Sequence, residues 1–138
     1  MHDRLRHILK DRMSLAPNDM INQKRCWQDI TRQCSTDIDA TIDFLDNYCS
    51  PVEFACIVEV AEDIALIIKH PPFIDALIRC AHRYDYITQN TSIISNIRLA
   101  IALIFEAKEQ QMILDYHNQL NRLQIELKIP EHFCNFPK

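Results

Sequence analysis

Carboxylate side chains are concentrated in the middle of the chain, where they could bind a cation or a cationic partner. Between Gln33 and Ile68 there is no lysine or arginine, whereas eight aspartate and glutamate residues occur there. Helical spacing places six of these acids on two helix faces. They are Asp39, Asp43 and Asp46 on the first face, and Glu59, Glu62 and Asp63 on the second. Antiparallel packing of the two helices would merge the six into one anionic patch.

This acidic patch has two interpretations. Acids can simply form solvated helix faces, and those near a helix N-terminus are favoured by the helix dipole. Alternatively, clustered like charges repel one another and gain from a cationic partner, so the patch could dock a basic protein. Nucleic acid is not expected as a partner, because binding a polyanion requires a basic patch and the chain carries a net charge of −4.

The spacing of titratable side chains does not match a catalytic or metal-binding pattern. The group Glu59-x-x-Glu62-Asp63 lacks the histidine that carboxylate-bridged di-iron sites place three residues after a glutamate. Cys80 and His82 lie two apart in a predicted helix, so they point about 200° apart and cannot pair as nucleophile and base. We therefore expect no catalytic residues, no metal and no cofactor, and a chain that is not an enzyme.

Six cysteines occur without a CxxC pair, and no second pair lies at zinc-ligand spacing from Cys80 and His82. In a reducing compartment cysteine behaves as a small hydrophobic residue. We expect the thiols to be free and buried, with Cys34 and Cys134 as the exposed exceptions.

Glycine is absent from all 138 residues. A dinucleotide-binding loop, a phosphate-binding P-loop and a nucleophile elbow each require glycine at fixed positions, which argues against three large classes of enzyme. Tight hairpins and bulges also depend on the freedom of glycine to adopt positive φ, whereas helix interiors do not. The chain is therefore predicted to be all-α.

Length and composition indicate one globular domain over residues 1–138, since 48% of the residues are hydrophobic and 25% are charged. The longest strongly apolar stretch, Ile93 to Phe105, is shorter than the roughly 20 residues that cross a bilayer. The first residues follow an amphipathic helical pattern rather than that of a secretory signal. We expect no membrane association and a cytoplasmic location.

Apolar periodicity predicts a single-domain bundle of six to seven helices, although paired short helices would also allow a solenoid-like stack. The predicted helices cover about residues 3–13, 20–34, 37–49, 51–69, 72–83 and 93–105. Ser50, Pro51 and Glu53 match a capping box, and Pro71 ends the helix that this box opens. A further apolar series from Ile113 to Leu127 leaves a bend, two helices or one long helix open at the C-terminal end.

Two details concern the second and third helices. Asn18 or Asp19 is predicted to cap the second helix, and Thr36 the third. One face of the second helix is formed by Met20, Lys24, Trp27, Thr31 and Cys34. We expect this face to point into the core, with Trp27 as its anchor and the lysine contributing its aliphatic stem.

Four segments between about residues 24 and 105 together resemble one known group of proteins. They are WQDI (27–30), TIDFLDNYCS (41–50), EVAEDIA (59–65) and FIDAL (73–77). These segments are similar to those of small all-helical immunity proteins of bacterial polymorphic toxin and contact-dependent growth inhibition systems. On this basis residues 24–105 would form the family-like core, followed by a helical extension at 106–129 and an irregular tail at 130–138.

The resemblance implies that the chain binds a cognate toxin domain, often a nuclease, and blocks its active site in the cytoplasm of the producing cell. A nuclease has a basic cleft that holds phosphates, and the six acids would occupy that cleft. Two alternatives stay open. A helical adaptor or regulatory scaffold would self-associate through the stripe from Ile113 to Leu127, and a small helical metalloenzyme would carry bound metal.

Overall fold

The computed structural model describes residues 2–88, 91–105 and 109–126, and all regular structure within them is helical. The helices are α1 (His2–Met13), α2 (Met20–Thr36), α3 (Ile38–Asn47), α4 (Pro51–Glu59), α5 (Ala61–Ile67), α6 (Pro71–Arg83), α7 (Asp85–Thr88), α8 (Thr91–Ile104) and α9 (Gln110–Glu126). The prediction of an all-α chain is confirmed for the described residues. The described residues contain nine helices instead of the expected six to seven, because one predicted helix is divided and the short α7 was not foreseen.

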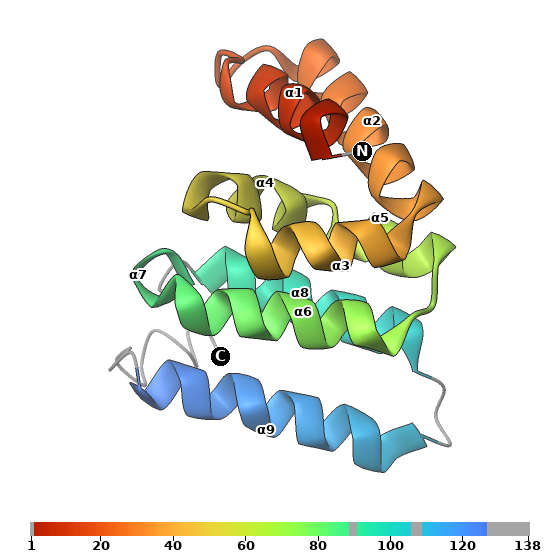
Figure 1. Ribbon diagram of the computed structural model, residues 1–138. Helices are drawn as coiled ribbons and strands as arrows, with labels where there is room; N and C mark the ends of the chain where they lie inside the picture. Colours follow the sequence, from red (N-terminus) through yellow and green to blue (C-terminus); the bar gives the residue numbers. More distant parts are fainter. Residues whose placement is uncertain (1, 89–90, 106–108, 127–138) are drawn as a thin grey trace.

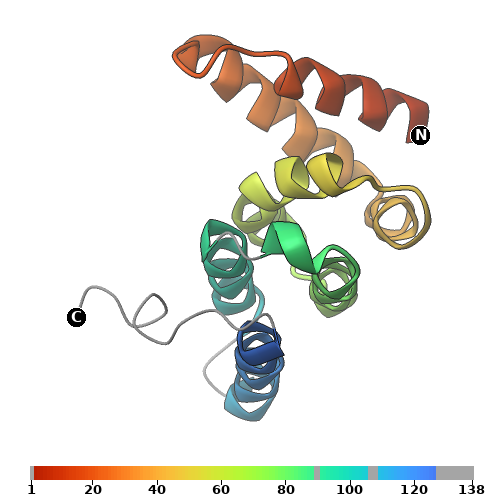
Figure 2. The same ribbon diagram turned by 90° about the vertical axis from the view of Figure 1, so that its left-hand side faces the viewer.

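The helices form layers that follow one another in the order of the sequence (Figure 1). The first layer is formed by α1 and α2, and α2 contacts α3 and α5 of the next layer. In turn, α3 packs on α6 and α5 packs on α8, and α8 also contacts α4, α6 and α9. A view turned by 90° shows the same order from α1 to α9 (Figure 2). This arrangement matches a bundle only in outline and comes closer to the solenoid-like stack.

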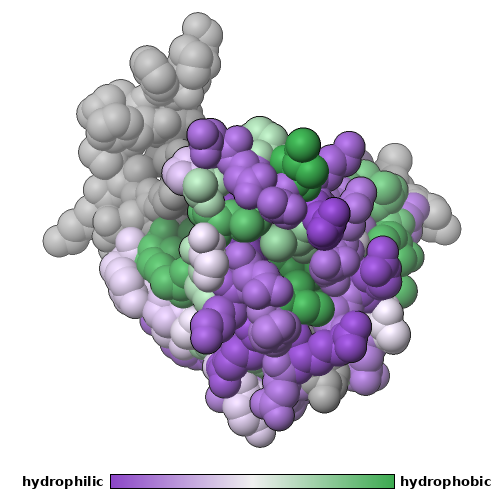
Figure 3. Space-filling model, turned by 90° about the horizontal axis from the view of Figure 1, so that it is seen from above, coloured by the Kyte–Doolittle hydropathy of each residue, from purple (hydrophilic) through white to green (hydrophobic). Residues whose placement is uncertain are grey.

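One continuous core runs through these layers and explains why they hold together. Its largest fully buried side chains include Phe44 of α3, Phe54 of α4 and Phe73 of α6. By contrast, the outer face over α1 and α2 is largely hydrophilic, with apolar side chains scattered among the polar ones (Figure 3). A polar outer surface on the terminal layer suits the end of a helical stack, because no further layer covers it.

Local capping signals place several helix ends as predicted. The Asp19 carboxylate accepts a hydrogen bond from the backbone N–H of Asn22 at the start of α2. At the start of α4 the Ser50 hydroxyl accepts from the Glu53 N–H at 3.2 Å, and the Glu53 carboxylate accepts from the Ser50 N–H at 2.9 Å. The predicted capping box is therefore confirmed.

The predicted cap of the third helix was wrong by one residue. Asp37 accepts the hydrogen bond from the Ala40 N–H at 3.1 Å, and α3 begins at Ile38. Thr36 is instead the last residue of α2, and its hydroxyl donates to the Arg32 carbonyl at 2.7 Å. The aspartate carboxylate is at least as good a cap as a threonine hydroxyl, so the boundary moves to Asp37.

The single helix predicted over residues 51–69 was also wrong, because the chain breaks at Val60. There the Val60 N–H bonds to the Ile57 carbonyl at 3.0 Å, which tightens the last turn of α4, and α5 begins at Ala61. Val60 and Ala61 are both buried. The break lets α4 pack on α1 and α8 while α5 packs on α2 and α8.

At the C-terminal end, the structure resolves the three alternatives in favour of two helices, because α8 ends at Ile104 and α9 begins at Gln110. Tyr116, Leu120 and Leu123 of α9 are buried in the core. The Tyr116 hydroxyl donates to Asp75 of α6 at 2.8 Å. Residues 127–138, with the predicted irregular tail and Cys134, lie outside the described residues.

Within the described ranges, five cysteines are free and buried, and these include Cys34. The expectation that Cys34 is exposed was wrong, because it lies on the buried side of α2 and belongs to the core cluster. Separately, none of the helices in the described part of the chain is long and apolar enough to span a membrane.

Candidate functional site

Two of the three acids on α3 are engaged within the chain. The Asp46 carboxylate accepts two hydrogen bonds from the Arg79 guanidinium, both at 2.9 Å. The Asp43 carboxylate lies 2.9 Å from His2 Nε2 and also accepts from Asn47, and these hydrogen bonds lower the pKa of Asp43. These contacts connect α3 to α6 and to α1, so both carboxylates already serve the fold.

The third acid of α3 has a different environment. Asp39 is almost fully exposed, and its carboxylate lies 3.9 Å from the His70 ring. His70 follows the C-terminal end of α5 by three residues. The start of α3 therefore lies beside the segment that connects α5 to α6.

The acids near the junction of α4 and α5 also divide into paired and unpaired groups. Glu59 accepts a hydrogen bond from Arg12 of α1 at 2.7 Å. Glu62 and Asp63 are exposed on α5 and make no ion pair or hydrogen bond through their side chains with the described residues. Three of the six predicted carboxylates, Asp43, Asp46 and Glu59, thus accept hydrogen bonds from other side chains of the chain. The available acids, Asp39, Glu62 and Asp63, form a smaller set than expected, gathered around α5.

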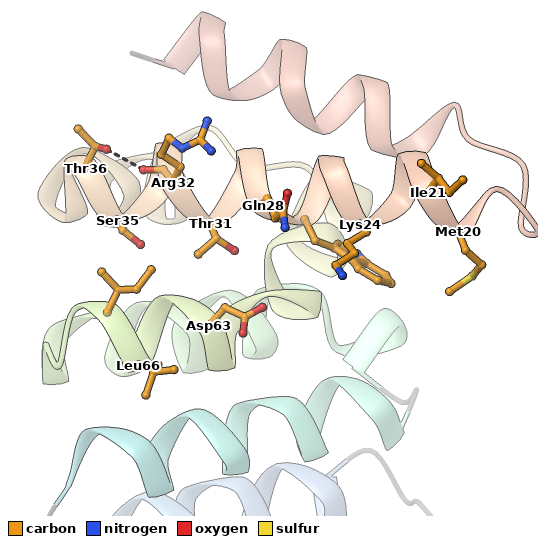
Figure 4. Close-up of a pocket in the computed structure, with 12 residues that line it drawn as sticks. Met20, Ile21, Lys24, Gln28, Thr31, Arg32, Ser35, Thr36, Asp63 and Leu66 are labelled. Atoms are coloured by element: carbon orange, nitrogen blue, oxygen red, sulfur yellow. Dashed lines mark hydrogen bonds between the residues drawn. The ribbon is translucent and has the colours of Figure 1, made fainter.

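Beside these acids, an open groove of about 1050 Å³ runs between α2 and α5. The apolar part of its lining includes four large side chains that are 58% to 81% exposed. They are Met20 and Ile21 of α2, and Leu66 and Ile67 of α5. Figure 4 shows Asp63 on α5 across from Thr31 and Ser35 on α2, with Leu66 lower on α5. Exposed apolar side chains that gather in a concave region mark an interaction site rather than ordinary surface.

The groove corrects the sequence interpretation of α2. The face with Met20, Lys24, Trp27, Thr31 and Cys34 was expected to point into the core. Cys34 and Thr31 are buried and Trp27 packs against the core, whereas Met20 and Lys24 are exposed in the groove. The side of α2 that packs into the protein instead carries Gln23, Cys26, Ile30 and Cys34, together with the edge residue Thr31. A signal for the groove was present in the sequence, because residues 51–69 are apolar on more faces than a helix with one covered side requires.

A row of polar atoms along this side of α2 lacks hydrogen-bond partners. The atoms are Trp27 Nε1, Thr31 Oγ1 and Ser35 Oγ, which are shielded from solvent and bonded to no other described residue. Thr31 is only 8% exposed. The three residues lie four apart along one helix face and all line the groove. Shielded polar groups without partners are uncommon, because each loses its hydrogen bond to water without replacement.

For metal chemistry, the described residues contain no group of three or more histidine, cysteine, aspartate or glutamate side chains that could hold an ion. Their distinctive surface is the apolar groove with the acids of α5 at its edge. Comparison with known proteins finds no matching family model, no matching curated protein and no matching solved structure. The similarity to immunity proteins accordingly remains a prediction from the sequence.

Proposed function

We propose that this chain is an immunity protein that binds a cognate toxin domain through the surface around α5 and performs no catalysis. The observation that carries the proposal is the position of two unpaired carboxylates, Glu62 and Asp63, directly beside the exposed side chains of Leu66 and Ile67. Protein interfaces combine apolar anchors with a charged rim in this way.

The mechanism follows from the charge of this surface. A nuclease toxin holds phosphate groups with cationic side chains, and the carboxylates of α5 can take the place of those phosphates. Asp39, at the far end of α5, extends the same negative region. Occupation of the cleft then excludes the nucleic acid, and the apolar side chains of the groove slow dissociation. Opposite charges on the two proteins also accelerate their encounter.

A growth assay with charge-reversal variants tests this proposal. The toxin would be the variable C-terminal domain of a large secreted protein encoded immediately upstream, expressed together with this chain. Wild type should relieve growth arrest, whereas Glu62→Lys/Asp63→Lys should bind at least tenfold more weakly, with the loss mainly in the association rate. The control, Asp3→Lys/Asp85→Lys, changes net charge equally at exposed positions outside α5.

Three results would contradict the proposal. The upstream domain could fail to arrest growth, the chain could fail to relieve the arrest, or the control could lose protection as completely as the α5 variant. The last result would show that net charge, rather than the α5 surface, governs binding.

The scaffold alternative receives less support. It depends on the apolar stripe from Ile113 to Leu127, and Tyr116, Leu120 and Leu123 of that stripe are buried against the rest of the chain. A stripe that covers its own core offers little free surface for a second copy. We therefore do not propose self-association through α9.

A further inference from the structure

The groove between α2 and α5 is elongated rather than round. Its lining on α2 extends from Met20 to Thr36, which at 1.5 Å per residue corresponds to about 24 Å. Its lining on α5 is shorter and extends from Asp63 to Ile67, or about 6 Å. The groove is open to solvent, and its volume of about 1050 Å³ reaches the upper end of the range typical of small-molecule pockets. An open, elongated groove with apolar walls suits a partner helix better than a compact ligand.

We propose that this groove binds one amphipathic α-helix of the partner protein. The apolar face of that helix packs against Met20, Ile21, Leu66 and Ile67. The identity of the partner as a toxin rests on the proposed function, whereas the helical form of the bound segment rests on the groove itself.

Charge complementarity specifies the polar residues of the helix. Lys24 on α2 and Asp63 on α5 both line the groove, and neither forms an ion pair with another described residue. A bound helix that carries a basic residue near Asp63 and an acidic residue near Lys24 neutralises both. The presence of both signs makes a nucleic-acid strand a poor occupant, because such a strand presents negative charge alone.

The row of unpartnered polar atoms on α2, from Trp27, Thr31 and Ser35, specifies further polar residues of the bound helix. Trp27 Nε1 is a hydrogen-bond donor, and the Thr31 and Ser35 hydroxyls can donate or accept. These three side chains are four residues apart, which places them about 6 Å from one another along α2. A helix lying alongside α2 presents side chains at the same interval when they too are four residues apart. Because these atoms are shielded from solvent in the free protein, asparagine, glutamine or serine at such positions would bond to them once the side chains of the row turn toward the bound helix.

A second copy of this chain fits the groove less well than a single helix. Two grooves facing each other are both concave, so their apolar walls would enclose empty space instead of packing closely. A cylindrical helix about 10 Å across fills a groove of this kind from one side. The oligomeric state therefore separates the two occupants experimentally.

The test uses a phage-displayed library of 18-residue helical peptides selected against the full chain. Selected sequences should show apolar residues with helical spacing and a basic residue on one flank. Leu66→Glu should weaken the binding of selected peptides at least tenfold, whereas the matched control Leu114→Glu, at a similarly exposed leucine of α9, should not. Thr31→Val keeps the shape of the side chain but removes the hydroxyl, and should weaken binding about tenfold.

Several outcomes would overturn the inference. They are the absence of enrichment, selected peptides without helical spacing, and peptides that bind Leu66→Glu as well as wild type. Unchanged binding by Thr31→Val would refute the role of the polar row. A wild-type dimer in light scattering that Leu66→Glu converts to a monomer would assign the groove to a second copy instead.

The same variants separate this inference from the proposed function. If the chain neutralises the toxin domain and Leu66→Glu still protects fully, the groove inference fails while the function stands. If selected helices bind the groove but the upstream domain is not neutralised, the proposed function fails and the groove inference stands.

Discussion

An ion pair between α1 and the first turn of α4 should contribute strongly to stability. The Glu53 side chain is only 5% exposed, and Arg6 donates to both of its oxygens, from Nε to Oε2 at 2.8 Å and from Nη2 to Oε1 at 3.1 Å. The same carboxylate accepts the Ser50 N–H of the capping box. Three hydrogen bonds therefore converge on one buried carboxylate that joins two helices.

The free energy of this arrangement follows from its parts. Glu53→Ala removes a cap contact worth about 1 kcal/mol and two charge-assisted hydrogen bonds. Because half of the Arg6 side chain is exposed, we use the lower end of their range, about 1.5 kcal/mol each, and expect a total loss of about 4 kcal/mol. Arg6→Ala should cost about 2 kcal/mol, because Glu53 then keeps the Ser50 contacts but loses its counter-charge. The double variant should show a coupling energy of about 1.5 kcal/mol.

The stabilisation that Glu53 provides should also depend on pH, and it should be lost in acid. Burial raises the pKa of Glu53, but hydrogen bonds from Arg6 and Ser50 outweigh it, so the net pKa lies below its ordinary value of 4.5. Because the pKa of Glu53 is lower in the folded than in the unfolded protein, its contacts stabilise the fold fully above about pH 4.5. This stabilisation is lost as the pH falls through the folded-state pKa. The destabilisation caused by Glu53→Ala should therefore decrease below pH 4.5.

Urea unfolding followed by circular dichroism from pH 7 to pH 3 measures these differences. Arg4→Ala serves as the control, because Arg4 is exposed and its guanidinium forms only one 3.1 Å hydrogen bond within the described residues, with the half-buried side chain of Gln33. It should change the free energy of unfolding by less than about 0.5 kcal/mol. A coupling energy near zero at pH 7, or a Glu53→Ala effect that does not change with pH, would refute the reasoning.

Three further predictions concern packing, thiols and the α3–α6 ion pair. Phe54→Ala should lower the free energy of unfolding by about 4 kcal/mol, because the ring is fully buried; a loss below 1 kcal/mol in urea would contradict this packing. Burial raises the pKa of Cys34 to about 12, so thiols in a Cys134→Ser variant should react with a disulfide reagent rapidly only after unfolding. Arg79→Ala should cost about 1 kcal/mol in thermal unfolding, since its partner Asp46 is partly solvated, and a cost above 3 would indicate a buried pair.

Helix ends that depend on local chemistry could be predicted from the sequence, and those that depend on tertiary packing could not. Ser50 and Glu53 lie three residues apart, so their capping interaction needs no distant partner. The break at Val60 involves neither glycine nor proline, the usual local signals. It depends on how α4 and α5 pack against different neighbours, which a local pattern does not contain.

The same limit explains why the acidic site was predicted only in part. The sequence shows where carboxylates gather but not which arginines reach them. Arg12 reaches Glu59 across 47 residues, and Arg79 reaches Asp46 across 33. Both pairs form because layers adjacent in the stack bring α1 against α4 and α3 against α6. Within the described residues, Glu62 and Asp63 are left unpaired on α5, whose own sequence contains no basic residue.

Part of the α2 face that was predicted to be buried lines an open groove instead. Apolar periodicity identifies a face that avoids water, but it does not say whether the cover comes from the same chain. On α2 one buried face carries Cys26 and Ile30, and the chain itself covers it. The other apolar region, with Met20 and Trp27, lines an open groove. Evolution rarely keeps large apolar side chains and shielded, unpaired polar groups together on a surface that stays in water. The simplest physical reason for both is a partner that covers the groove, and the four-residue spacing along α2 points to a helix.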